Sequence, residues 1–154
     1  MIYELSQQFY FEAAHTLNRD IETTGSRRIH GHTYHAEVTL LGEPEERSGM
    51  VADLGSVRRH IEAVKSLLDH HFLDDVPDLG PATLENLCKF IFDQMISRCP
   101  QLLSVSVARP ASGDKCVLRK DSAVNQFAIS RTEVRTREPH VNSAGVHVDA
   151  MCKA

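Results

Sequence analysis

Alternating apolar and polar positions predict two long β-strands in the first third of the chain. In residues 2–14, Phe9 and Phe11 occupy alternate positions, and aromatic side chains suit a pleated surface. Residues 29–41 are rich in β-branched and aromatic residues, which is typical of a second strand. The intervening residues 16–28 are polar and contain a glycine, so we expect a loop between the two strands.

Helical periodicity replaces the alternation in the next part of the chain. Residues 56–68 repeat apolar side chains at helical spacing, and either Asp53 or Ser56 can cap the start of this helix. The apolar stripe consists of Val57, Ile61, Val64 and Leu68. Residues 69–82 are rich in Asp, Gly and Pro and therefore predict a loop.

A second helix is expected over about 84–97, with Thr83 as its cap and Pro100 beyond its end. Its apolar stripe consists of Leu84, Leu87, Ile91 and Met95. Residues 103–109 alternate as a third strand, and residues 116–120 form a short fourth strand after a turn.

The order strand, strand, helix, helix, strand, strand predicts an α+β fold. We expect a four-stranded antiparallel sheet with two helices on one face, built by a domain of residues 1–120. Residues 121–154 are expected to be a C-terminal extension, in which 126–131 form one strand and the end beyond Glu138 is mobile or partner-dependent.

The composition of the 154-residue chain is that of a globular protein, with one unusual feature in its nine histidines. A net charge of −4 and a pI of about 6.1 give no reason to expect nucleic acid or an anionic membrane as a partner. No apolar run approaches the roughly 20 residues that a membrane helix needs. The histidines indicate either a metal or acid–base site or a chance enrichment of imidazoles.

The N-terminal region and the cysteines favour a cytoplasmic protein. Glu4 and Glu12 interrupt the first residues, which lack the apolar segment of a signal peptide. The four cysteines have no CxxC spacing, so we expect reduced thiols that are buried or incidental.

The positions of three histidines suggest a metal site. His30 and His32 are separated by Gly31 in one strand, so both imidazoles lie on the same face. His15, at the end of the neighbouring strand, is the natural third ligand, and three histidines would leave the fourth position of a zinc ion open. The alternative is core or solvent-facing histidines. His35 lies on the opposite face and is a poor ligand.

A second candidate site follows the first helix. Asp69 precedes His70 and His71, and a carboxylate beside an imidazole suits general acid or base chemistry. The alternative is that these histidines interact with the last carbonyls of the helix. His70 is the better candidate and His71 the lesser one. The other histidines are treated as background: His35, His60, His140 and His147.

Several motifs together resemble the 6-pyruvoyl-tetrahydropterin synthase and 6-carboxytetrahydropterin synthase family. They are FEAAH at 11–15, RRIHGHTYH at 27–35, LLDHHFLDD at 67–75 and PATLENL at 81–87. The resemblance covers roughly residues 1–120. It implies the tunnelling fold, in which subunits join their sheets into a barrel, and a homohexamer of two trimers with sites at subunit interfaces.

The resemblance also implies a chemistry. The substrate would be 7,8-dihydroneopterin triphosphate, and Zn²⁺ held by His15, His30 and His32 would polarise its side-chain oxygens. Asp69 and His70 would relay a proton, and Thr83 and Glu85 would contact the substrate. In the family, a cysteine four residues before HGH is the base, and a glutamate on a later strand anchors the pterin ring.

The sequence departs from the family at two of these positions. Ser26 replaces the cysteine, and a hydroxyl is far less acidic than a thiol, although Ser26 remains the candidate catalytic group. Arg109 stands where the glutamate is expected, and a guanidinium only donates hydrogen bonds. Arg109 therefore indicates an anionic or acceptor-rich ligand. Arg27 and Arg28 would face a phosphate or form part of a solvated loop.

Three functions remain open at this level. The first is a zinc-dependent lyase on dihydroneopterin triphosphate or a related pterin. The second is a divergent zinc enzyme with a changed substrate or a partial reaction. The third is a non-catalytic, zinc-holding oligomer that binds a pterin or a protein. The pathway is also open between queuosine-type deazapurine, biopterin and folate metabolism.

Overall fold

The computed structural model describes residues 1–21 and 23–121. The main elements are β1 (Tyr3–His15), β2 (His30–Gly42), α2 (Leu54–Lys65), α3 (Leu84–Ile96), β3 (Leu102–Arg109) and β4 (Asp114–Arg119). A single turn, α1 (Thr23–Ser26), lies between β1 and β2. None of the helices described is long and apolar enough to cross a membrane.

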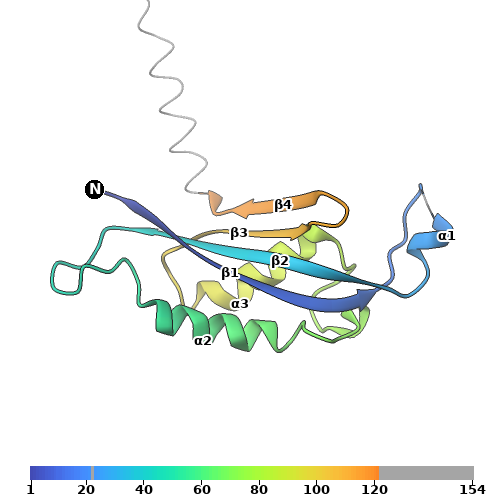
Figure 1. The fold of residues 1–154 in the computed structure, drawn as a ribbon, viewed down its shortest axis with the longest axis horizontal. Helices are drawn as coiled ribbons and strands as arrows, with labels where there is room; N and C mark the ends of the chain where they lie inside the picture. The colour runs from blue at the N-terminus through green and yellow to red at the C-terminus, as the bar shows by residue number, and fades with distance from the viewer. Residues whose placement is uncertain (22, 122–154) are drawn as a thin grey trace, which may run out of the picture.

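The strands form one antiparallel sheet in the order β1-β2-β3-β4. The longest pairing joins β1 to β2 without a break, from Tyr3 opposite Gly42 to His15 opposite His30. Both long helices, α2 and α3, lie on one face of this sheet (Figure 1). The α+β prediction is therefore confirmed.

The two faces of the sheet differ in character. The helix-covered face carries buried side chains such as Phe11, Tyr34 and Val38, which belong to the hydrophobic core. Phe11 stacks on Tyr34 with ring centroids 5.0 Å apart. The other face carries residues such as Glu12 and Thr33, which are exposed. Because side chains alternate along a strand, the parity of each position decides whether it faces the core or the open face.

Capping residues and apolar stripes position the helices as expected. Asp53 caps α2 by accepting a hydrogen bond from the Gly55 N–H, and Thr83 caps α3 by accepting one from the Asn86 N–H. Each helix buries its apolar stripe against the sheet; the buried members include Val57, Ile61, Val64, Leu87, Ile91 and Met95.

Two segments predicted as loops contain short helical turns, so those predictions were incomplete. In 16–28, the Arg27 N–H bonds the Thr23 carbonyl oxygen and closes α1, a single turn that has no apolar periodicity to reveal it. In 69–82, Leu73–Asp75 form a 3₁₀ turn around the buried Leu73. Helix α2 also ends at Lys65 and not at the predicted Leu68. The chain forms a turn there, in which the Leu68 N–H donates a hydrogen bond to the Lys65 carbonyl oxygen.

Several predictions concern residues outside the described ranges. These are the strand at 126–131, the mobile end beyond Glu138 and the role of the extension 121–154 as a whole. They stay predictions. Cys88, Cys99 and Cys116 are free thiols, and Cys88 and Cys99 are buried, as expected.

Leu67 and Leu68, which lie directly after α2, test how the chain packs against the core just before Asp69. Leu68 is fully buried, whereas 43% of Leu67 is exposed. We expect Leu68→Ala to lower the free energy of unfolding by about 2–5 kcal/mol, because it leaves a cavity in the core. Leu67→Ala should change it by only about 0.5 kcal/mol. Urea unfolding monitored by circular dichroism measures both, and equal losses would contradict the packing described.

Candidate metal centre

Three histidines meet at one end of the sheet because of the β1–β2 register. His15 is directly opposite His30, and His32 lies two positions further along β2 on the same face. The ring centroids are 4.5 Å apart for His15 and His30, 5.2 Å for His15 and His32, and 4.9 Å for His30 and His32. One ligand atom from each ring lies within 4.8 Å of the others, so the group could hold a metal ion.

Burial and hydrogen bonding suit His15 to this role. The side chain is 1% exposed, yet among the described residues neither of its ring nitrogens has a hydrogen-bond partner. Leaving both nitrogens unsatisfied in the core is costly, and a metal ion would satisfy one of them. Three imidazoles are a donor set that zinc accepts readily, with a fourth position open.

The protonation states also suit metal binding. Burial, followed by the neighbouring His30 and His32, lowers the pKa of His15 to about 4. Burial, followed by the Arg109 guanidinium, also lowers the pKa of His32. Both rings are therefore neutral at pH 7, and only a neutral imidazole offers a lone pair to a metal.

Contacts around the cluster fix the rings and the strand end. His30 Nδ1 lies 2.8 Å from the Arg28 carbonyl oxygen, and donating this hydrogen bond leaves Nε2 for a metal. The carboxylate of Asp74 accepts hydrogen bonds from both the N–H and the hydroxyl of Thr16, the residue after His15. The negative charge of this carboxylate raises the pKa of His15 and so offsets a small part of the lowering by burial.

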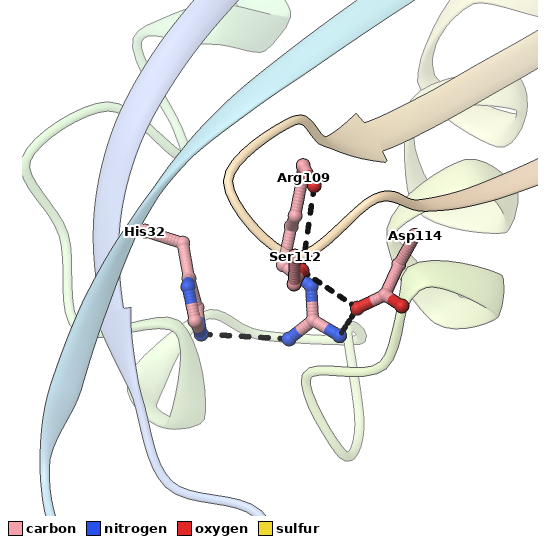
Figure 2. Close-up of polar contacts among 4 residues, drawn as sticks. All are labelled: His32, Arg109, Ser112 and Asp114. Atoms are coloured by element: carbon pink, nitrogen blue, oxygen red, sulfur yellow. Dashed lines mark hydrogen bonds and ion pairs between the residues drawn. The ribbon is translucent and has the colours of Figure 1, made fainter.

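Arg109 lies beside the cluster rather than out in solvent. Figure 2 shows its guanidinium between His32 and Asp114. Nη1 is 3.4 Å from His32 Nε2, Nη2 is 2.6 Å from Asp114 Oδ2, and the side chain is only 13% exposed. The hydroxyl of Ser112, followed by Arg109, holds the pKa of Asp114 below its usual range, so this carboxylate is ionised at neutral pH.

The predicted Asp69–His70 pair is present near the same end of the sheet. Asp69 Oδ1 accepts a hydrogen bond from the Glu12 N–H at 2.9 Å and lies 3.2 Å from His70 Nδ1. The Glu12 N–H, followed by the contact with His70, keeps the pKa of Asp69 below its usual range. His70 is 76% exposed and borders a cavity of about 500 Å³ that His32 also lines.

Four other predicted site residues divide into two groups. Thr83 and Glu85 line a second cavity, together with Arg109 and Asp114. Ser26 and Arg27 line neither of these two cavities. The Ser26 side chain is buried and its Oγ donates to the Thr23 carbonyl oxygen, whereas Arg27 is exposed and its Nε donates to Asn18. For Arg27 this contact favours the solvated-loop interpretation over a phosphate contact.

Two residues and one contact at this end were not singled out from the sequence. Tyr34 lies two positions after His32, so strand parity alone places it on the same face. Asp114 is the register partner of Arg109 across the β3–β4 turn, and the hairpin could have revealed the pair. The contact between Asp74 and Thr16 joins distant segments, and no local pattern predicts it.

The fold and this site define an α+β domain with a three-histidine cluster at the end of its sheet, and comparison with known proteins gives its family. The family model for 6-pyruvoyl tetrahydropterin synthase matches residues 4–121, and the chain belongs to this family.

Relatives of this chain carry the names of two different enzymes. The chain is 39% identical over 82 residues to a 6-pyruvoyl tetrahydrobiopterin synthase of Poecilia reticulata, which covers 51% of this chain and 56% of that protein. It is 33% identical over 107 residues to a 6-carboxy-5,6,7,8-tetrahydropterin synthase of Synechocystis, which covers 66% of this chain and 81% of that protein. The chain thus spans little more than half of the first of these relatives.

Solved structures agree on the fold. The 6-pyruvoyl tetrahydropterin synthase of Caenorhabditis elegans superposes with a TM-score of 0.70 at 24% identity, over 79% of this chain and 97% of that one. The enzyme from Plasmodium vivax gives a TM-score of 0.59 at 20% identity, over 78% and 98% of the two chains. The predicted tunnelling fold of the single chain is confirmed.

The metal cluster makes a matched prediction about two histidines of β2. His30→Ala should lose the metal, because it removes one of the converging rings. His35→Ala should keep it, because His35 is exposed on the opposite face. Metal analysis after zinc loading and gel filtration checks this, with about one ion per chain expected for the unaltered protein. Equal metal content in the two variants would contradict the site.

Proposed function

We propose that this chain is a zinc-dependent lyase of the tetrahydropterin synthase type, acting on 7,8-dihydroneopterin triphosphate or a related pterin. The observation that carries the proposal is the cluster of His15, His30 and His32, whose converging rings suit a zinc ion. Membership of a family of pterin synthases supports the substrate class.

The bound zinc would act as a Lewis acid toward oxygens of the substrate side chain. The chain's own part is to hold three rings in place while leaving one coordination position open. His15 is fixed by burial, and His30 by its hydrogen bond to the Arg28 carbonyl oxygen. Such prior positioning lowers the cost of ordering the ligands when the substrate binds.

Proton transfer is assigned to His70. The contact of its Nδ1 with Asp69 leaves Nε2 to exchange a proton with the substrate. Asp69 is itself held by the Glu12 N–H, so the carboxylate can orient the ring and stabilise its charged form. The cavity that His70 shares with His32 would bring the proton relay and the metal to one ligand.

Ser26 stands at the position, four residues before HGH, where the family has its thiol base. A hydroxyl that donates to a backbone carbonyl oxygen is a poor base at neutral pH. The reaction would therefore depend more heavily on His70 and the metal. The outcome, either triphosphate elimination or cleavage of the side chain, stays open between the two kinds of enzyme in the family.

A changed substrate is the second candidate, and Arg109 favours it. A carboxylate at this position would accept N–H groups of a pterin ring, whereas the guanidinium of Arg109 only donates. The expected hydrogen bonds to the ring would then be reversed. A non-catalytic, zinc-holding oligomer is the remaining alternative and predicts ligand binding without consumption.

We propose a homohexamer as the working assembly. Within the described residues, β1 and β4 are the two edges of the sheet, and residues 69–72 hydrogen-bond β1 near its C-terminal end, at Glu12 and Ala14. Exposed strand edges readily pair with other chains, and edge pairing between copies would close a barrel around the open, polar face. The cytoplasmic location stays a prediction.

Turnover of dihydroneopterin triphosphate tests the proposed reaction. The zinc-loaded protein should consume it, and mass spectrometry of the products should show either the 6-pyruvoyl or the 6-carboxy compound. His30→Ala should abolish the reaction, whereas His35→Ala should leave it intact. Absence of turnover by the zinc-loaded protein would contradict a lyase acting on this substrate.

The serine at position 26 gives a gain-of-function prediction. Because Ser26 is buried and lines neither cavity of the single chain, this prediction requires that the side chain reach the substrate in the assembled hexamer. In that case Ser26→Cys should raise kcat by about tenfold or more, because a thiol is much closer to ionisation than a hydroxyl at neutral pH. The pH–rate profile should gain a limb from the new thiol. An unchanged kcat would show that the missing cysteine does not limit this protein.

A further inference from the structure

The cavity beside Arg109 has an environment that the proposed reaction does not explain. Its volume is about 500 Å³, and it lies where α3 begins, beside the end of the sheet that carries the histidines. Tyr34 and Arg109 line it from the sheet, and Thr83 and Glu85 line it from the start of α3.

The charges around this cavity favour an anion. Its lining contains three basic side chains, Arg19, Arg109 and Lys115, and two acidic ones, Glu85 and Asp114, which leaves an excess of one positive charge. The first turn of the 13-residue helix α3 adds a partial positive charge. A cation held by the histidines would add more, because Arg109 contacts His32 directly.

Two side chains that line the cavity have polar groups without a partner. Tyr34 is 1% exposed, and its hydroxyl has no hydrogen-bond partner among the described residues. A phenol hydroxyl can donate a hydrogen bond to a ligand in the cavity. Arg109 Nε is likewise buried and without a partner. Buried polar groups in native proteins are rarely left unsatisfied, and a ligand, an ion or an ordered water is the usual partner where the protein offers none.

The Arg109 Nε–H can only donate, and the protonated Tyr34 hydroxyl can donate as well as accept, so the two groups together suit a ligand that offers acceptor atoms. A guanidinium has five N–H donors and no acceptor, and its fork matches a carboxylate or phosphate. The donor edge of an aminopyrimidine ring would face the donors of Arg109 and Tyr34, so its N–H groups would depend on the carboxylates of Glu85 and Asp114, the second of which already accepts from Arg109.

We propose that this cavity binds an oxyanion group of the ligand, a carboxylate or a phosphate, through Arg109 and Tyr34. Asp114 is a positioning residue, because its contact with Nη2 holds the guanidinium in place. The inference rests on the proposed function in one respect only, namely that the ligand carrying this group is the substrate of the zinc site.

Equilibrium binding of simple anions tests this site without turnover. Isothermal titration calorimetry of the zinc-loaded full chain would use inorganic phosphate and, separately, acetate as probes. Arg109→Gln should weaken binding of the preferred anion by at least tenfold. Arg119→Gln, which removes an exposed arginine from the neighbouring β4, should change it less than twofold.

A second variant guards against a folding defect in Arg109→Gln. Tyr34→Phe removes only the hydroxyl, so it should keep the melting temperature and weaken anion binding by about threefold. Binding of both anions that is unchanged in Arg109→Gln and Tyr34→Phe would overturn the proposal. Binding of phosphate alone, or of acetate alone, with dependence on Arg109 would support it and identify the group.

The anion-binding measurement and the turnover assay can give independent outcomes. Binding that depends on Arg109, without consumption of dihydroneopterin triphosphate, would refute a lyase acting on this substrate and support the oxyanion site. Turnover of this substrate, together with anion binding that Arg109→Gln leaves unchanged, would support the lyase and refute the oxyanion site.

Discussion

The unbroken antiparallel pairing of β1 with β2 is the interaction on which the rest of the site depends. It places His15 directly opposite His30 and sets His32 on the same face. A shift of one residue would turn one strand's imidazoles to the open face and destroy the cluster. The core beneath this face, including the Phe11–Tyr34 stack, holds the register because a slip would expose it.

The same face determines the electrostatics. The rings lie at the edge of an apolar core, and burial keeps His15 neutral and ready to bind a metal. Arg109 on β3 and Asp114 on β4 lie next to the histidines, so a guanidinium and its carboxylate partner border the cluster. A site with this charge pattern favours an anionic ligand more than a pterin ring alone requires.

Much of this arrangement follows from the sequence, because the face on which a strand residue lies and the capping of a helix both depend on nearby residues. The three histidines, the α+β architecture and the cap at Asp53 were predictable from periodicity and residue type. The placement of Ser26 in a helical turn was not, since a single turn carries no periodic pattern. The unpaired hydroxyl of Tyr34 depends on which neighbours pack around it, and only three-dimensional packing determines that.

The identity of the metal ligands is the central claim, and X-ray absorption spectroscopy at the zinc edge tests it most directly. The zinc-loaded full chain should show three imidazole nitrogens at about 2.0–2.1 Å together with one oxygen. A sulfur shell at about 2.3 Å, or fewer than three imidazoles, would contradict the account.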